Sequence, residues 1–299
     1  MSPRETHVGR LPIGATADDG DGGGRRNASA MLGAVRDDVR QTLRCGWIDP
    51  AIEAAAAEPV FFTAAWSAIR PNVGKSFLSL TRTVRDEAAR TVRGVAGVPD
   101  VRRQLQAELG EEELRRIEDC ARAAHQVTAK VQLVVHALLR AVRRDRIGGT
   151  GREEPPVRRG VPEWQRWMSF QPSVDGQAAV FDQILESLRL PALPATLRLM
   201  SRWPSALTTM WDELHPVATA PAWRTGAASL RRLVLAGVSG LPHPVELQWM
   251  ALKERGFDEP ERARLADTLA AHEGAMAQHS LFAAFAWLAF GSPEIGTEG

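Results

Sequence analysis

The hexapeptides GVAGVP (94–99) and GVSGLP (237–242) are nearly identical and begin 143 residues apart in a chain of 299 residues. Two prolines and the tryptophan between them also recur, with unchanged spacing and an offset of 145: Pro59, Trp66 and Pro71, then Pro204, Trp211 and Pro216. The run ARAAH, which ends at His125, corresponds to TLAAH, which ends at His272. Landmarks in one order at a nearly constant offset indicate a repeat of roughly 145 residues, which is the size of a domain.

A repeat of this size predicts two similar halves that pack about a pseudo-two-fold axis, with a site between them. A stretch between the halves is rich in Gly, Pro and charge and lacks periodicity, as linkers do. The Gly- and Asp-rich N-terminus predicts a disordered tail. The expected organisation is a tail at 1–30, a first helical repeat at 31–144, a linker at 145–165 and a second helical repeat at 166–299.

The periodicity predicts an all-α fold. Apolar residues recur at spacings of three and four, Ala, Leu, Arg and Glu dominate, and alternating β-branched residues are nearly absent. The expected helices are 30–44, 50–57, 60–70, 75–93, 101–109, 111–124, 127–144, 178–189, 196–202, 205–214, 224–236, 244–255, 259–271 and 274–290. Gly94 and Gly237 are expected to end long helices as left-handed caps, and Pro99 and Pro242 then prevent continuation.

Charge and cysteine content exclude several classes of function. A net charge of +1 gives no electrostatic reason to expect nucleic acid or an anionic membrane as partner. Cys45 and Cys120 form no CxxC motif, which fits a reducing compartment and argues against structural zinc. The N-terminus has no apolar core, and the longest apolar run, 281–290, is too short to span a bilayer. We therefore expect a soluble, cytoplasmic protein.

Self-sufficient catalytic motifs are absent: the sequence has no GxSxG, P-loop, HExxH or GxGxxG after a strand. His272 and His279 lie seven residues apart, whereas metal-binding histidines on a helix favour three or four, so we expect no metal and no cofactor. The equivalent histidines 125 and 272 allow two interpretations. They either converge on a central cavity or are hydrogen-bonded core residues.

The run DDVRQTLRCGWIDPAIEAAAAEPVFFTAAW (37–66) resembles the first half of the group I 2-haloacid dehalogenases. These are all-α enzymes built from two repeats, which accept both enantiomers and commonly associate into dimers. MSRWPSALTTMWDELHPV (200–217) is similar to the family's "ANWP…DE…PV" segment, and RLADTLAAHEGAMAQ (264–278) to its late helix. The resemblance covers roughly residues 35–290.

The resemblance implies a hydrolase that acts on the carbon–halide bond of a small 2-haloacid. In the family, an Asp activates a water that displaces halide from C2 directly, with inversion and without an ester intermediate. Such a site needs polar groups for the substrate carboxylate, an apolar or aromatic cradle for the halide, and a base that is ionised near neutral pH.

The family's substrate-binding positions map onto this chain with departures. The active-site Trp corresponds to Trp47, but Pro50 stands where an aromatic residue follows it. The pocket Asn of the first half falls near Thr128, and the pocket Tyr of the second half near His272. His125, the counterpart of His272 in the first half, is a further candidate for substrate binding.

The family's general-base Asp corresponds to Thr196, whose hydroxyl is far too weakly acidic to replace a carboxylate near neutral pH. Asp49 could supply the base from the first half, although its position before a proline is also that of a helix N-cap. Asp182 and Glu186 are further carboxylates, with surface exposure as the alternative. His272 could act as a base when neutral.

Two other functions stay open from the sequence. The chain could be a catalytically lapsed or altered relative that binds a small carboxylic acid, or a structural, dimerising helical protein without a ligand. An enzyme or a binder should have a polar cavity between the halves, lined by Trp47, Thr196 and His272. In a structural protein, apolar side chains should fill that space. The candidate partners are a small carboxylate or haloacid and a second copy of the chain.

Overall fold

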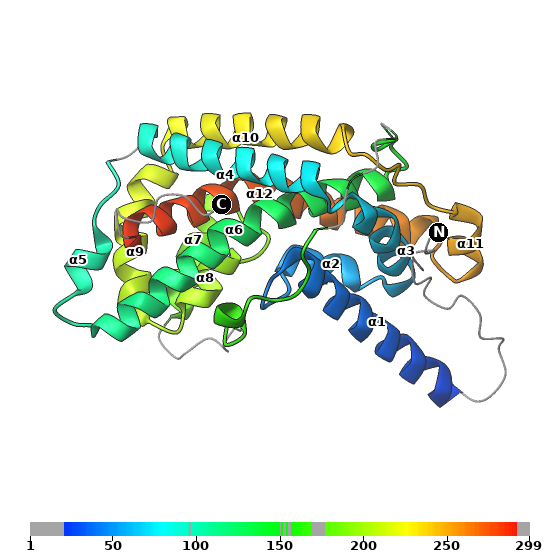
Figure 1. The fold of residues 1–299 in the computed structure, drawn as a ribbon, viewed down its shortest axis with the longest axis horizontal. Coiled ribbons are helices and arrows are strands. Elements are labelled where there is room, and N and C mark those ends of the chain that lie inside the picture. The colour runs from blue at the N-terminus through cyan, green and yellow to red at the C-terminus, as the bar shows by residue number, and fades with distance from the viewer. Residues whose placement is uncertain are drawn as a thin grey trace, which may run out of the picture.

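The computed structural model describes residues 21–95, 97–149, 151, 154, 157–168 and 177–291. All regular elements in these ranges are helices, which confirms the all-α fold (Figure 1). The α-helices are α1 (Asp21–Leu43), α2 (Pro50–Ala56), α3 (Pro59–Ile69), α4 (Lys75–Val95), α5 (Val101–Leu105), α6 (Glu111–Val142), α7 (Ala178–Leu188), α8 (Ala195–Met200), α9 (Pro204–Ala218), α10 (Pro221–Ser239), α11 (Trp249–Glu254) and α12 (Glu259–Phe290). Two short 3-10 helices are η1 (Arg70–Asn72) and η2 (Glu163–Gln165).

The expected N-terminal tail is partly helix. Residues 1–20 lie outside the described ranges, but residues 21–29 belong to α1. That helix therefore starts nine residues before the expected position at 30. Glycine disfavours a helix only by about 1 kcal/mol per residue, so a glycine-rich composition alone does not forbid one.

The repeated prolines mark helix starts. Pro59 and Pro204 lie in the first turns of α3 and α9, where a missing N–H costs nothing. The next prolines of the repeat behave differently, because Pro71 belongs to η1 whereas Pro216 remains inside α9. The repeat therefore sets where both helices begin but not where they end.

A second correspondence between the halves is a tryptophan hydrogen bond. The indole N–H of Trp66 donates to Asp38 at 2.8 Å, and the indole N–H of Trp211 donates to Gln183 at 3.2 Å. Donors and acceptors are both 145 residues apart in the chain. The two bonds tie α3 to α1 in the first half and α9 to α7 in the second.

The structure corrects the expected left-handed glycine caps. Gly94 and Gly237 lie inside α4 and α10, and neither has a positive φ. Gly237 is instead a contact glycine, because a Cβ there would lie 2.3 Å from Leu80 Cδ2. Left-handed residues do follow helices in both halves, namely Arg44 and Arg189 at φ of 57° and 51° after α1 and α7, and Arg144 at φ of 65° after α6.

Each long helix is continuous, so the breaks expected near residues 125 and 272 were wrong. α6 contains 32 residues and α12 also contains 32, and buried side chains continue through both expected breaks. No proline interrupts either segment there, and helix formation is cooperative once it has started. By contrast, α5 and α11 are shorter than expected, at five and six residues.

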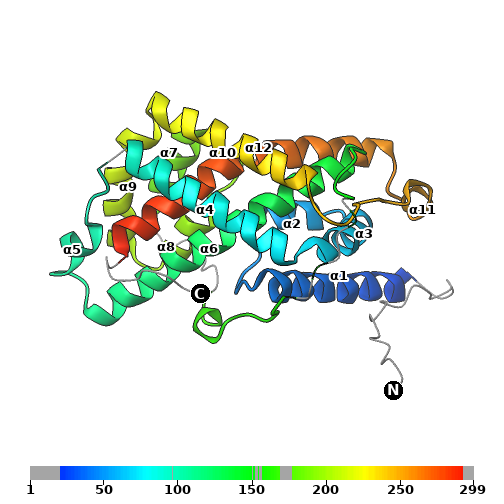
Figure 2. The same ribbon diagram turned by 45° about the horizontal axis from the view of Figure 1, so that its top comes forward.

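The two long helices run antiparallel through the middle of the molecule (Figures 1 and 2). Residues further along α6 meet progressively earlier residues of α12. This order is seen in three contacts, in which His125 stacks on Trp287, Gln132 accepts a hydrogen bond from Ser280, and His136 lies against Glu273. The equivalent helices α4 and α10 are also antiparallel, since position 226 faces position 91 and position 237 faces position 80. These pairings define a pseudo-two-fold axis between the halves.

The linker packs closely on both halves at glycines. Gly149 N donates to Leu241 O at 3.0 Å, and Val245 N donates to Ile147 O at 3.1 Å, so the start of the linker follows the second hexapeptide. Further along, Gly46 approaches the linker so closely that a Cβ would lie 2.5 Å from Gln165 O.

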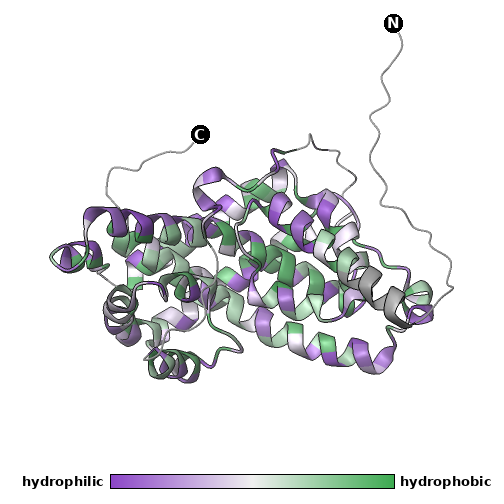
Figure 3. Cartoon of the chain, turned by 90° about the horizontal axis from the view of Figure 1, so that it is seen from below, coloured by the Kyte–Doolittle hydropathy of each residue, from purple (hydrophilic) through white to green (hydrophobic). Residues whose placement is uncertain are grey.

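Hydrophobic residues concentrate on the central helices, and hydrophilic ones are frequent on the outer helices (Figure 3). One cluster of buried apolar side chains extends from α1 to α12, so the halves share a single core. Among the described residues, no helix is both long and apolar enough to cross a membrane.

Candidate functional site

Four helices meet where the halves join. The short helices α2 and α8 hold equivalent places in the two halves, and each packs against both α6 and α12. Three predicted site residues lie in or just before these short helices, namely Trp47, Asp49 and Thr196. Thr128 comes from the middle of α6. The fold thus brings segments carrying four of the six predicted site residues toward one centre.

Asp49 is a buried carboxyl group at the start of α2. It is the N-cap of that helix, because its Oδ1 accepts the N–H of Ala51 at 3.0 Å. Burial raises the pKa of Asp49 to about 6, although the Ala51 N–H and the charge of Arg198 act in the opposite direction. Arg198 belongs to α8, so the second half influences this carboxyl group. At neutral pH, most of the group is ionised.

The other three residues are also buried. Trp47 lies in the connection between α1 and α2, and Thr128 lies on the buried face of α6. Thr196 is 1% exposed, and its hydroxyl has no hydrogen-bond partner within the described residues. A hydroxyl in this condition is available to a bound ligand or an internal water.

Sequence reasoning missed Gln132 and Ser280 at the centre of the two long helices, and it considered His279 only as a metal ligand. The hydroxyl of Ser280 donates to Gln132 Oε1 at 2.7 Å, and His279 precedes Ser280 in α12. Gln132 lies one turn after Thr128, so both side chains share a face of α6. A signal was available, since Gln132 and His279 are 147 residues apart, the same offset that relates His125 to His272.

The histidines 125 and 272 do not meet at a central cavity. The ring of His125 stacks on Trp287 at 4.7 Å between ring centroids. His272 precedes Trp287 by 15 residues, which corresponds to about 22 Å along α12. The antiparallel arrangement places equivalent residues on opposite sides of the axis unless they lie on it. His125 therefore occupies an aromatic contact within the core.

Both rings are neutral at neutral pH. Burial lowers the pKa of His125 to about 3, and the charges of Arg85 and Arg93 act in the same direction. Burial also lowers the pKa of His272, whose Nδ1 has no hydrogen-bond partner within the described residues. A neutral imidazole can accept a proton, so His272 keeps the chemistry of a base.

The remaining predicted carboxylates lie on the surface. Asp182 and Glu186 are exposed on α7, which agrees with the interpretation of both as surface residues. A third carboxylate, Glu273, is buried but engaged. It accepts two hydrogen bonds of 2.7 Å from Arg231, and its Oε1 lies 2.6 Å from His136 Nε2. These partners leave Asp49 as the better candidate for a base.

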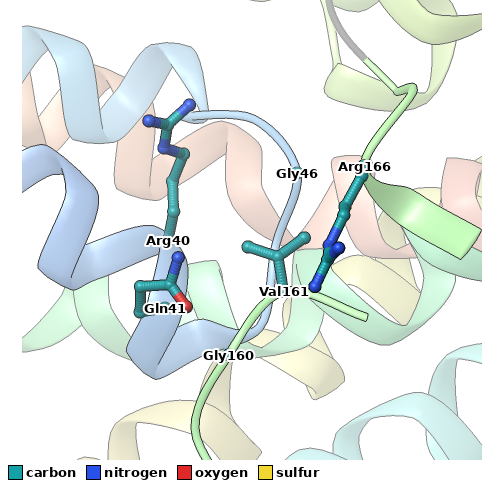
Figure 4. A pocket seen from close by; sticks show the side chains of 6 residues that line it. All are labelled: Arg40, Gln41, Gly46, Gly160, Val161 and Arg166. Carbon is teal, nitrogen blue, oxygen red and sulfur yellow. The ribbon is translucent and has the colours of Figure 1, made fainter. Parts of the chain in front are cut away.

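A cavity of about 310 Å³ opens beside the loop that leads to Trp47. Arg40 and Gln41 of α1 line one side, and Val161 of the linker and Arg166, which follows it, line the other (Figure 4). The expected lining residues Trp47, Thr196 and His272 are not part of it, although Gly46 is. The guanidinium group of Arg40 is paired with Asp37, and that of Arg166 can attract a small anion.

Within the described ranges, no group of three or more His, Cys, Asp and Glu side chains is placed to hold a metal ion. The two cysteines are both buried and unpaired with each other.

This arrangement of helices is the all-α fold of the D-2-haloacid dehalogenases. A solved structure of a D-2-haloacid dehalogenase mutant in complex with D-2-CPA superposes with a TM-score of 0.79 at 17% identity, over 86% of this chain and 91% of the other. A D-2-haloacid dehalogenase in complex with L-LA superposes with a TM-score of 0.77 at 18% identity, over 87% and 92%.

Sequence relatives carry related names. An (R)-2-haloacid dehalogenase of Rhizobium sp. (strain NHG3) is 24% identical over 234 residues, 74% of this chain and 88% of the relative. A configuration-inverting 2-haloacid dehalogenase of Pseudomonas sp. (strain 113) is 25% identical over 281 residues, 91% of each chain. No family model matches the chain.

These names leave one implication of the resemblance unconfirmed. The sequence predicted enzymes that accept both enantiomers. The matched relatives and structural neighbours are instead named for the (R) or D form, or for inversion of configuration. The similarity to 2-haloacid dehalogenases is confirmed, but the comparisons do not support the acceptance of both enantiomers.

Proposed function

We propose that this protein hydrolyses the carbon–halide bond of a small 2-haloacid, with Asp49 as the general base. The observation that carries the proposal is the buried carboxyl group of Asp49 at the junction of the halves. Its raised pKa of about 6 makes it a stronger base than an exposed carboxylate, yet leaves it ionised at neutral pH. The similarity to 2-haloacid dehalogenases supplies the reaction class.

The reaction balances without a cofactor. Asp49 accepts one proton of a water while the water oxygen attacks C2 of the substrate. The carbon–halogen bond breaks, and its electron pair leaves with the halide. The products are a 2-hydroxyacid of inverted configuration, a halide ion and a proton, which Asp49 returns to solvent. Thr196, at the position of the family's base, serves as a hydrogen-bonding group in this scheme.

Substrate contacts follow from the residue types at the junction. The indole ring of Trp47 offers an aromatic surface for the halogen, and the hydroxyl groups of Thr128 and Thr196 offer hydrogen bonds. The cavity beside Gly46 provides an approach, because the guanidinium group of Arg166 attracts a carboxylate.

The proposal is tested by halide release from (R)- and (S)-2-chloropropionate and 2-bromopropionate. Wild-type protein should release halide, and Asp49→Asn should lose at least about a hundredfold in kcat because the amide cannot accept the proton. The His272→Gln variant tests His272, the second candidate base, and this variant should retain activity. Release that survives in Asp49→Asn but is lost in His272→Gln would assign the base to His272 instead.

A second candidate function is the binding of a small carboxylic acid without turnover. Thr196 favours it, since a threonine occupies the position of the family's catalytic Asp. Binding of 2-chloropropionate without release of chloride from either enantiomer would establish this alternative.

A further inference from the structure

Gln132 and His279 occupy equivalent positions in the two halves. They are 147 residues apart, and the crossing of α6 and α12 runs through them. The hydroxyl of Ser280, the neighbour of His279, donates to Gln132 Oε1 at 2.7 Å. Because Gln132 touches the neighbour of its own counterpart, the pseudo-two-fold axis passes through this point. Figures 1 and 2 show α6 and α12 crossing in the middle of the molecule.

Both side chains are buried and incompletely bonded. Gln132 is 0% exposed and His279 is 3% exposed. Within the described residues, neither the ring nitrogens of His279 nor the Nε2 of Gln132 have a hydrogen-bond partner. The buried hydroxyl of Thr196, on a helix that packs against both α6 and α12, is in the same condition.

Unpaired buried polar groups destabilise a folded protein, and native structures nearly always pair them with protein, water or ligand. An apolar residue at position 132 or 279 would remove this cost. Three such groups on three mutually packed helices therefore need partners that water or a bound ligand would supply.

The available atoms select the chemistry of that species. The amide of Gln132 offers two N–H donors, the ring of His279 offers one N–H, and the hydroxyl of Thr196 offers one O–H. A carboxylate accepts at both oxygens and fits this excess of donors. We propose that Gln132, His279 and Thr196 bind the carboxylate of a small 2-substituted carboxylic acid at the pseudo-two-fold axis. The inference shares the ligand class of the proposed function, on which it rests, but it requires no turnover.

The protonation state of His279 agrees with this role. Burial lowers the pKa of His279 to about 3, and neighbouring His272 acts in the same direction. The ring is therefore neutral at neutral pH and can donate through one nitrogen while it accepts a hydrogen bond through the other. Gln132, His279 and Thr196 would therefore bind the carboxylate as neutral donors, and Asp49 would act as the base.

The test uses calorimetric titration of the full-length chain with propionate and with lactate, neither of which has a halide to lose. Wild-type protein should bind both acids, and His279→Leu and Gln132→Met should each bind at least about tenfold more weakly. The control is His243→Leu in the connection between α10 and α11, which removes a histidine outside α6, α8 and α12 and should bind as the wild type does. Ser280, deprived of its acceptor in Gln132→Met, can donate to a backbone carbonyl one turn earlier.

Thermal melting distinguishes a ligand site from a structural one. Since both substitutions remove unpaired polar groups, the variants should melt at or above the wild-type temperature while they lose binding. If His279→Leu does not fold, His279→Gln replaces it. As an independent readout, long-range proton–nitrogen spectra of the wild type should show the ring resonances of His279 shifting when propionate is added.

Two results would overturn the inference: wild-type protein that binds neither acid, or variants that bind both acids as tightly as the wild type does. Failure of the proposed function looks different. In that case the wild type binds both acids through His279 and Gln132 but releases no halide. If the wild type releases halide and the variants bind both acids as tightly as it does, the proposed function stands and the inference about His279 and Gln132 fails.

Discussion

Glu273 is the most strongly engaged buried charge among the described residues of α12, and its replacement gives a sharp test of the fold's energetics. The carboxylate is 2% exposed and lies between Arg231 of α10 and His136 of α6. The second ring nitrogen of His136 lies 2.9 Å from Gln132 O, so both of its nitrogens face oxygen acceptors. Glu273 therefore joins three helices through one group.

The expected magnitude follows from the pKa of this carboxyl group. Although burial alone would raise it, the hydrogen bonds and charges of His136 and Arg231 bring the pKa of Glu273 down to about 2 from 4.5. At 1.36 kcal/mol per pKa unit, the ionised form contributes about 3 kcal/mol of stability. Because the folded-state pKa is lowered, this contribution is complete above about pH 4.5 and is lost as pH falls toward 2.

The perturbation is Glu273→Gln, measured by urea unfolding at pH 7 and at pH 3. At pH 7 the variant should be less stable by about 3 kcal/mol, since the neutral amide cannot replace the charge-assisted hydrogen bonds from Arg231, whose own half-exposed guanidinium group stays hydrated. Between pH 7 and pH 3, the difference between wild type and variant should shrink by about 2 kcal/mol, as the carboxylate takes up its proton in the unfolded wild-type chain.

Glu112→Gln is the matched control, because Glu112 forms an exposed pair with Arg116 one turn along α6. Such pairs contribute about 0.5 kcal/mol or less. A Glu273→Gln variant that unfolds within about 0.5 kcal/mol of wild type at pH 7 would refute the reasoning. So would a difference that stays constant between the two pH values.

Four further predictions concern packing, backbone strain and the site. Gly226→Ala should destabilise by about 1–2 kcal/mol in thermal unfolding, because its Cβ would lie 2.2 Å from Thr91 Cγ2, and adding Thr91→Ala should restore most of the loss. Arg189→Gly should stabilise by about 1 kcal/mol in urea unfolding, since its φ of 51° is costly for a residue with a side chain; a loss of stability would contradict this. Halide release should fall as pH drops through about 6, the raised pKa of Asp49, and a profile that stays flat on both sides of this pKa would exclude this base. Arg166→Gln should raise KM for 2-chloropropionate severalfold at low salt with kcat unchanged, and an unchanged KM would remove the cavity from the substrate's path.

Local signals predicted much of the fold. Helical periodicity and the near absence of alternating β-branched residues led to the all-α class, and prolines at positions 59 and 204 marked helix starts. Asp49 before Pro50 predicted an N-cap, and the structure has one. These features depend on neighbours within one or two turns, so the chain itself carries the information.

Where the prediction failed, distant parts of the chain decided the outcome. Gly237 has the sequence context of a cap, but close packing of Leu80 from the other half explains why a glycine is there. The expected interruptions of α6 and α12 did not occur, because buried faces continue through them and packing outweighs local propensity.

For the site, the sequence by itself determined the repeat, the equivalent positions and the residue types available for chemistry. Only the tertiary structure decided which equivalent residues meet, because the antiparallel crossing of α6 and α12 brings the positions on its axis together and separates all others. Gln132 and His279 lie at that crossing, whereas His125 and His272 lie on opposite sides of it. The order of contacts between two helices is a property of their packing, which no spacing along one chain specifies.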